Sequence, residues 1–264
     1  MKIINIIRGG IGNQLFQWAI TKTMEIKFGA EVYLDISPLY LNTGVTPRTF
    51  DLPQFPNIKY KILSNGGNED FYSNPIIEYN EGNFNIDSTV LNEHNNYKFL
   101  DYWQSYNYFE KYKNEIKSDL SFSDGFKNEI LSKYPEINTN SVSLHIRRTD
   151  YVSSNGYHPV QPISYYERAL KIIGDYDNVL VFSDDIEWCK KNLNFKNQVF
   201  VENNSVSFDI WSMSLCKHNI IANSSFSWWG AWLNENENKI VVTPGNWFGW
   251  GGVPYMHPKN WLVI

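Results

Sequence analysis

Two adjacent arginines stand in the segment of the chain whose residue types are most suggestive of chemistry, His145-Ile146-Arg147-Arg148-Thr149-Asp150. Guanidinium groups make bidentate contacts to phosphate oxygens and do not lose their charge in proteins. Two of them at the end of a short apolar strand can neutralise a diphosphate leaving group without a metal ion. The alternative is a surface salt-bridge role, which the presence of a histidine and an aspartate in the same segment disfavours.

Two other segments combine small or polar residues with a predicted helix start. Asn223-Ser224-Ser225 places hydroxyls and backbone amides before a helix, where a phosphate can bind. Simple helix capping is the rival interpretation for these serines. Near the N-terminus, the glycine-rich turn that contains Gly10 and Asn13 lies between a strand and a helix, where backbone amides can approach an anion. It lacks a P-loop ending, and a plain tight turn remains the alternative.

Acidic residues supply two further candidates. Ser183-Asp184-Asp185 resembles a metal-binding Asp-x-Asp, but the spacing differs and no His or Cys ligand set accompanies it. One of these carboxylates is expected instead to cap the next helix and to orient a neighbour. Asp209 stands between Phe208 and Ile210, where a carboxylate could accept two hydrogen bonds from a guanine edge. A first-turn aspartate favoured by the helix dipole explains Asp209 equally well.

Composition limits the class of protein. The 264 residues are 42% hydrophobic and 16% aromatic, which is typical of a globular protein with a sizeable core, although some aromatic side chains could instead stack on sugars. A net charge of −5 argues against a nucleic-acid partner. Cys189 and Cys216 give no support for a disulfide framework, and no signal peptide or membrane span is evident. We therefore expect a cytoplasmic protein.

Strands and helices alternate through the second half, which predicts an α/β fold with a parallel sheet and ligands beyond the carboxyl ends of its strands. The predicted helix from Ser164 to about Ile173 is expected to be capped by Ser164. The expected strands are Val142–Ile146, Asn178–Phe182, Gln198–Val201, Asn219–Ala222 and Lys239–Val242, and the expected helices are Ser164–Ile173, Ile186–Leu193, Ser207–Lys217 and Phe226–Leu233.

The first half begins in the same way, with a strand Ile3–Ile7, a helix Asn13–Phe28 and a strand Glu31–Leu34. From residue 38 to about 82 the sequence predicts loops, which could shape an acceptor site. A boundary is expected within Ser121–Asn140. We therefore predict two domains, residues 1–135 and residues 136–264.

Together these segments resemble the bacterial α-1,2-fucosyltransferases of glycosyltransferase family 11. The resemblance covers nearly the whole chain and is carried by Gly9–Gln17, Tyr102–Tyr106, His145–Val152, Phe182–Asp185 and Met213–Trp232. It implies a GT-B-like α/β fold of two Rossmann-like domains with parallel sheets facing a cleft. Residues 1–135 would form the acceptor-side domain, and residues 136–264 would form the domain that binds the GDP-sugar. It also implies inverting transfer of L-fucose from GDP-L-fucose to a glycan acceptor, with no required metal or other cofactor.

The resemblance also implies roles for the candidate residues. Arg147 and Arg148 would bind the diphosphate, and His145 the guanosine end. Among the other donor-binding candidates, Asp209 would bind guanine. The remaining candidates are Gly10 and Asn13 near the fucose and diphosphate, Asp184 beside the arginines, and Ser224 and Ser225 on the phosphates.

The catalytic base is left open between Asp150 and His158, because Asn155 stands where protein-directed relatives place a glutamate shortly after the arginine motif. O2 of a terminal galactoside is the acceptor position that the family suggests. A lipid-linked acceptor would bring the protein to the cytoplasmic face of the inner membrane. The competing classes are a transferase of another nucleotide sugar, a metal-dependent transferase of different fold, and a non-catalytic sugar-binding module.

Overall fold

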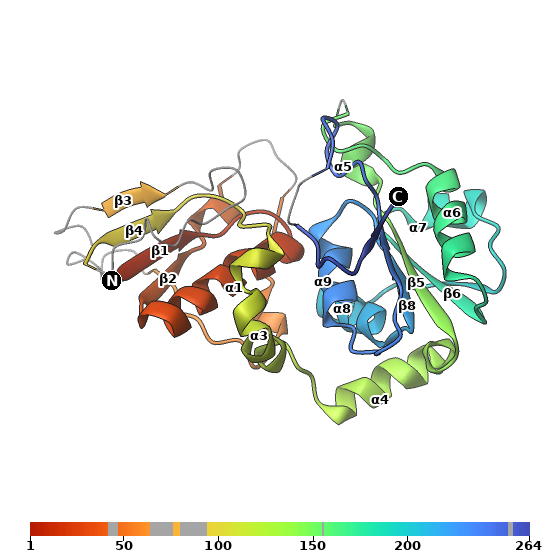
Figure 1. The fold of residues 1–264 in the computed structure, drawn as a ribbon, viewed down its shortest axis with the longest axis horizontal. Helices are drawn as coiled ribbons and strands as arrows, with labels where there is room; N and C mark the ends of the chain where they lie inside the picture. The colour runs from red at the N-terminus through yellow and green to blue at the C-terminus, as the bar shows by residue number, and fades with distance from the viewer. Residues whose placement is uncertain (42–46, 64–75, 80–93, 155, 253–255) are drawn as a thin grey trace. The chain divides into compact units, whose positions relative to one another are not determined.

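The computed structural model describes residues 1–41, 47–63, 76–79, 94–154, 156–252 and 256–264 (Figure 1). The chain divides into two compact units. The N-terminal unit contains residues 1–121 and 254–257, and the C-terminal unit contains residues 122–253 and 258–264. We expected the boundary at 135/136; the structure places it 14 residues earlier (135 minus 121), because Phe126 packs against Phe208 and Trp211 of the C-terminal unit.

The N-terminal unit contains a four-stranded parallel sheet of order β2-β1-β4-β3. Its main helix ends where Gly29 adopts φ 59°, a left-handed conformation that glycine tolerates best. The elements are β1 (Lys2–Ile6), α1 (Ile11–Phe28), β2 (Glu31–Asp35), η1 (Ser37–Leu39), η2 (Leu52–Gln54), β3 (Ile76–Tyr79), β4 (Asn96–Phe99), η3 (Tyr106–Tyr108), η4 (Glu110–Tyr112) and α3 (Lys113–Asp119).

The C-terminal unit contains a six-stranded parallel sheet of order β10-β9-β8-β5-β6-β7. Its elements are α4 (Asp124–Lys133), η5 (Pro135–Asn138), β5 (Ser141–Ile146), α5 (Thr149–Val152), α6 (Ile163–Ile173), β6 (Asn178–Ser183), α7 (Ile186–Asn192), β7 (Gln198–Phe200), α8 (Val206–Leu215), β8 (His218–Ile220), α9 (Ser225–Leu233), β9 (Val241–Thr243) and β10 (Leu262–Val263). The predicted α/β class is confirmed in both units.

Both faces of the C-terminal sheet are covered, by α6 and α7 on one side and by α8 and α9 on the other (Figure 1). Strand β5 is buried at every position, and its side chains alternate between the faces. Val142, Leu144 and Ile146 join the apolar core under α6 and α7. The alternate residues meet polar partners, since Ser143 accepts a hydrogen bond from Asn219 and His145 contacts Ser227 of α9.

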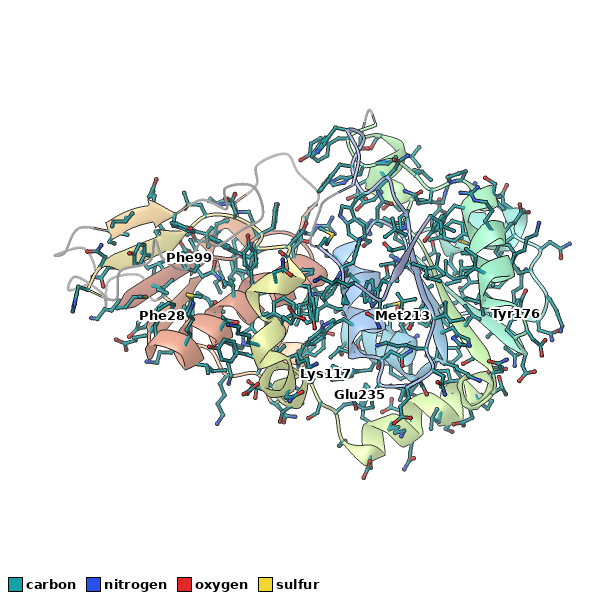
Figure 2. All side chains as sticks on the ribbon, in the orientation of Figure 1. Phe28, Phe99, Lys117, Tyr176, Met213 and Glu235 are labelled. Carbon is teal, nitrogen blue, oxygen red and sulfur yellow. The ribbon has the colours of Figure 1, made fainter. Side chains whose placement is uncertain are left out.

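Helices α8 and α9 approach closely at Gly230, where a Cβ would lie 2.7 Å from the Cβ of Met213 (Figure 2). Helices α6 and α4 differ from the sequence-based expectations. The cap position of α6 is Pro162, and Ser164 lies inside the helix, so the predicted cap was wrong. Proline suits the position before a helix because it has no amide hydrogen to satisfy. Helix α4 was not predicted, because Ile130 is its only buried residue.

Candidate functional site

The strand order of the C-terminal unit identifies the edge where a ligand is expected to bind. Counted from β5, the chain runs through β6 and β7 in one direction and then through β8, β9 and β10 in the other. The order therefore reverses between β5 and β8, and ligands of doubly wound sheets bind beyond the carboxyl ends of such strands. The residues that follow these two strands are joined by Tyr151, whose hydroxyl donates a hydrogen bond to the carbonyl oxygen of Asn223 at 2.9 Å.

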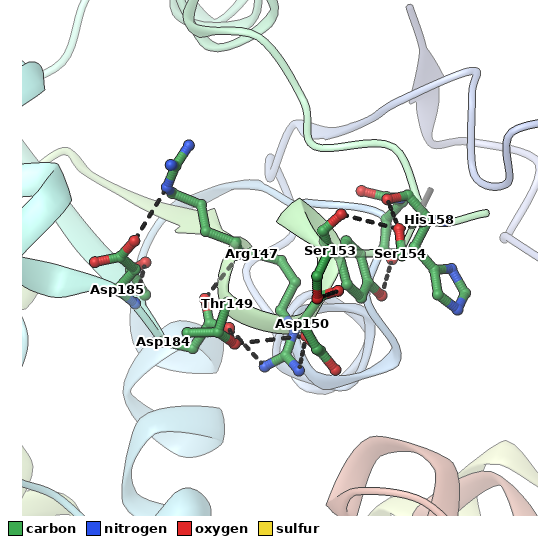
Figure 3. Close-up of polar contacts among 12 residues, drawn as sticks. Arg147, Thr149, Asp150, Ser153, Ser154, His158, Asp184 and Asp185 are labelled. Carbon is green, nitrogen blue, oxygen red and sulfur yellow. Dashed lines mark hydrogen bonds and ion pairs between the residues drawn. The ribbon is translucent and has the colours of Figure 1, made fainter. Parts of the chain in front are cut away.

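Arg147 lies between two carboxylates at this edge (Figure 3). Its Nη2 contacts Oδ1 of Asp150 at 2.7 Å, and its Nη1 contacts Oδ2 of Asp184 at 3.1 Å. The guanidinium also lies over the ring of Tyr151, 5.3 Å from its centroid. Both amino groups of Arg147 are thus held by aspartates, which fixes the orientation of this side chain.

Arg148 is held in a different way. Its guanidinium lies 3.7 Å from the ring centroid of Trp188, and its Nε contacts Oδ2 of Asp185 at 3.2 Å. Its backbone amide donates to Asp184. No hydrogen bond or ion pair in the described part of the chain involves the two Nη atoms of Arg148. Stacking and one ion pair therefore orient this guanidinium and leave its outer fork available.

The aspartates after β6 perform the structural role that the sequence predicted for one of them. Asp185 caps α7 by accepting a hydrogen bond from the amide of Trp188, and the same side chain contacts Arg148. Asp184 accepts hydrogen bonds from the hydroxyl of Thr149 and from the amide of Arg148. The expectation that one carboxylate caps the helix and orients a neighbour is confirmed.

His145 is buried and lies near the end of β5, two residues before Arg147. Its Nδ1 is 2.9 Å from the hydroxyl of Ser227 in α9, and its ring packs against Phe226. Burial lowers the pKa of His145, Asp184 opposes the shift and Arg147 adds to it, and the resulting pKa is about 3. His145 is therefore neutral at physiological pH. Its contacts connect the end of β5 to the first turn of α9.

This burial predicts a pH-dependent stability. An unfolded histidine takes up its proton near pH 6.5, whereas folded His145 resists protonation until about pH 3, so stability present above pH 6.5 is lost as the pH falls toward 3. His145→Gln should reduce the loss of unfolding free energy between pH 8 and pH 5 by about 2 kcal/mol. Urea unfolding at pH 8 and at pH 5 measures this difference in unfolding free energy. The control is His94→Gln, which lies on an exposed turn. An identical loss in His145→Gln and wild type would contradict the assignment.

The segment after β8 leads into α9. Ser224 occupies the cap position and is buried, yet its side chain makes no capping hydrogen bond. Simple capping by Ser224, the rival interpretation, is therefore not what the structure contains. When no side chain caps a helix N-terminus, its first backbone N–H groups remain oriented toward an incoming anion. Ser225 is the first residue of this helix.

The two candidates for the catalytic base lie near Arg147. Asp150 is bound to that arginine through Oδ1. His158 stacks on Tyr151 with ring centroids 4.7 Å apart, and its Nδ1 is buried without a hydrogen-bond partner among the described residues. Burial lowers the pKa of His158, as does Arg147, while Asp150 raises it. Asn155 lies outside the described residues.

Asp209 belongs to a different group of side chains. It accepts a hydrogen bond from Asn204 at 2.9 Å, and burial raises its pKa to about 6 against the opposing effects of Asn204 and Lys133. None of its described contacts reaches Arg147 or Arg148. The structure therefore does not bring Asp209 together with the arginine cluster by direct contact.

Gly10 and Asn13 lie in the N-terminal unit. Gly10 occupies the cap position of α1, so no side chain caps this helix. Asn13 accepts a hydrogen bond from Gln104 at 2.6 Å. The neighbouring Gly9 has φ 79°, and a Cβ there would lie 2.5 Å from the side chain of Asn13. The glycine turn therefore has a steric requirement of its own, as the tight-turn interpretation states.

Sequence reasoning missed two residues of the arginine cluster, Tyr151 and Trp188. Tyr151 lies on the short helix α5, which was not predicted, whereas Trp188 lies on α7, which was predicted over Ile186–Leu193. Tyr151 follows Arg147 by four residues, and Trp188 follows the cap Asp185 by three. Cys189 and Cys216 are buried free thiols. No helix in the described ranges is both long and apolar enough to cross a membrane.

The protein contains two α/β units with parallel sheets. The C-terminal sheet has the strand order 3-2-1-4-5-6 of dinucleotide-binding sheets, with charged residues at its switch point. These features define a Rossmann-like enzyme of the GT-B type. The chain belongs to glycosyl transferase family 11, whose sequence model matches residues 56–249. The protein is accordingly a glycosyltransferase.

Three similar proteins illustrate the relationship. The O-antigen biosynthesis glycosyltransferase WbnK of Escherichia coli is 31% identical, over 98% of this chain and 99% of its own. An alpha-1,2-colitosyltransferase of Escherichia coli is 30% identical, over 93% and 92%. Among solved structures, the fucosyltransferase NodZ from Bradyrhizobium matches with a TM-score of 0.54 at 13% identity, covering 87% of this chain and 90% of NodZ. This last similarity bears on the fold alone.

Proposed function

We propose that the protein transfers L-fucose from GDP-L-fucose to O2 of a terminal galactoside in a glycan acceptor, with inversion at the anomeric carbon and without a metal ion. The observation that carries the proposal is Arg148 at the topological switch point, oriented by Trp188 and Asp185 with its outer fork available. Membership of family 11 supports transferase chemistry. NodZ, which shares the fold, has been studied with GDP-fucose soaked into its crystals.

In the proposed donor complex the diphosphate lies between Arg148 and the start of α9. The Nη atoms of Arg148 contact phosphate oxygens, and the amides of Ser224 and Ser225 contact the other side. Arg147, held by Asp150 and Asp184, adds positive charge near the bridging oxygen and positions its neighbour. We keep Asp209 as the guanine ligand and Gly10 and Asn13 as donor contacts.

The proposed reaction is a single displacement. An acceptor hydroxyl attacks the anomeric carbon, the bond from that carbon to the phosphate oxygen breaks, and GDP leaves with the electron pair. Charge that develops on the bridging oxygen is stabilised by the arginines. The hydroxyl proton passes to a base, for which we favour His158, because its imidazole is kept neutral by burial whereas Oδ1 of Asp150 is bound by Arg147.

A second donor deserves a direct test because one relative is a colitosyltransferase. That similarity favours GDP-colitose as the alternative nucleotide sugar. The relative named for O-antigen biosynthesis suggests that the acceptor belongs to a cell-surface polysaccharide. A lipid-linked precursor of such a glycan would place the reaction at the cytoplasmic face of the membrane.

The test has a donor part and an acceptor part. Calorimetry with GDP-fucose, GDP-colitose and GDP-mannose should give the tightest binding for GDP-fucose. Incubation with GDP-fucose and a panel of galactosides, followed by mass spectrometry and linkage analysis, should yield a fucose on O2 of galactose. Full activity in excess chelator is expected. Absence of GDP binding, or transfer only from another donor, would overturn the proposal.

A further inference from the structure

Three aromatic side chains that the donor site does not use pack together in the C-terminal unit, and two of them are exposed. Phe248 and Trp250 stack with centroids 4.5 Å apart and ring planes within 3° of parallel. Tyr157 packs against Trp250 edge to face at 5.0 Å. Trp250 is 65% exposed and Tyr157 is 55% exposed, so these two rings are not part of the core. We refer to Tyr157, Phe248 and Trp250 as the aromatic platform.

The backbone holds the platform in a defined shape. Phe248 and Gly251 exchange two backbone hydrogen bonds of 2.9 Å, which close a tight turn around Trp250. The amide of Gly249 donates to the carbonyl of Tyr157 at 3.0 Å. A Cβ at Gly249 would lie 2.0 Å from the carbonyl oxygen of Gly156, so only glycine lets the two segments approach this closely. The exposed rings are therefore positioned by the backbone.

The platform is continuous with the site that contains Arg147. Tyr157 contacts His158 with centroids 4.7 Å apart, and His158 also packs against Phe248 at 5.3 Å. His158 in turn stacks on Tyr151, above which the guanidinium of Arg147 lies. Figure 3 shows His158 and Ser154 on the side of Asp150 away from Asp185. His158 and Tyr151 thus connect the platform to Arg147.

Resting on the proposed function, we infer that the aromatic platform binds a pyranose ring of the acceptor glycan. Flat exposed indole and phenol rings pack against the apolar face of a sugar, and they bring polar groups to its hydroxyls. No hydrogen bond within the described ranges involves the indole N–H of Trp250 or the hydroxyl of Tyr157. Part of acceptor recognition is therefore assigned to the C-terminal unit, in addition to the loops that the sequence predicted from residue 38 to about 82.

The test compares Trp250→Ala with Trp250→Phe, and uses Ile172→Ala on α6 as the control for loss of an exposed apolar side chain. With saturating GDP-fucose and lactose as acceptor, Trp250→Ala should raise the KM for lactose about tenfold, whereas Trp250→Phe and Ile172→Ala should stay close to wild type. The Kd for GDP, measured by calorimetry, should be unchanged in all three variants.

Donor-free binding separates this inference from the proposed function. Saturation-transfer NMR with lactose, maltose and cellobiose should show sugar ring protons saturated by wild type and not by Trp250→Ala, even if GDP-fucose is not the donor. Three results would overturn the inference: no saturation by wild type, weaker GDP binding with unchanged KM for lactose, or loss of binding to phosphatidylethanolamine–phosphatidylglycerol vesicles with unchanged sugar binding. The last two would indicate a nucleotide or membrane contact instead.

Discussion

Replacing Arg148 by lysine should lower kcat for sugar transfer by about 10²–10³-fold. Arg148 stacks on Trp188, contacts Asp185 through Nε and still presents two Nη groups, three functions that require a planar fork. A lysine ammonium can satisfy Asp185 or a phosphate, and it cannot do both in the same geometry. The lost contacts are those made to the charge that develops on the departing diphosphate.

The measurement is single-turnover transfer at saturating GDP-fucose, together with calorimetry of GDP. Arg168→Lys, an exposed arginine of α6, is the matched control and should keep full activity. Melting temperatures without ligand show whether Arg148→Lys is folded. Full activity of a folded Arg148→Lys, or a larger loss in Arg147→Lys, would show that Arg148 is not the main diphosphate ligand.

The pairing of the arginines with their aspartates depends on strand register. Ile146 of β5 is paired with Ser183 of β6, so the residues that follow each strand come out side by side. The sequence indicated that both strands exist and that polar residues follow them. It could not indicate that Asp184 would bind Arg147 while Asp185 takes Arg148, because a register shift by one residue would exchange the partners.

Five of the six strands of the C-terminal sheet were predicted, for a physical reason, and the exposed two-residue β10 was not. Its strands are short apolar segments between helices with an apolar face, and this alternation is typical of parallel sheets covered on both sides. Helix α4 was missed because a helix with one buried residue has no apolar periodicity to detect. Strand β4 was also not predicted; it spans four residues, of which Tyr97 and Phe99 are buried.

The individual roles of the site residues were less accessible from sequence. Burial keeps His145 neutral, and its contact to Ser227 connects β5 to α9, whereas the family resemblance implied a role at the guanosine end. The aromatic platform joins residues about ninety positions apart, Tyr157 and Trp250. Contacts of this kind arise from how the loops fold back over the sheet, which residue spacing does not encode.

His158→Phe should lower kcat by about 10²–10⁴-fold if His158 removes the acceptor proton. Phenylalanine retains the ring contacts to Tyr151 and Phe248, so packing is kept while the base is lost. A base must be unprotonated, and burial lowers the pKa of His158, so wild-type activity should persist below pH 6.5 before it falls. The acid limb of the single-turnover rate should be absent in His158→Phe.

Asp150→Asn tests the same assignment, because it removes the charge of the other candidate base and leaves His158 in place. The negative charge of Asp150 raises the pKa of His158, whereas Arg147 lowers it, so removing that charge should lower the pKa and move the acid limb to lower pH. The limb should persist in Asp150→Asn with a smaller loss of rate than in His158→Phe. Loss of the limb in Asp150→Asn alone would assign the proton transfer to Asp150, and two unchanged profiles would exclude both residues.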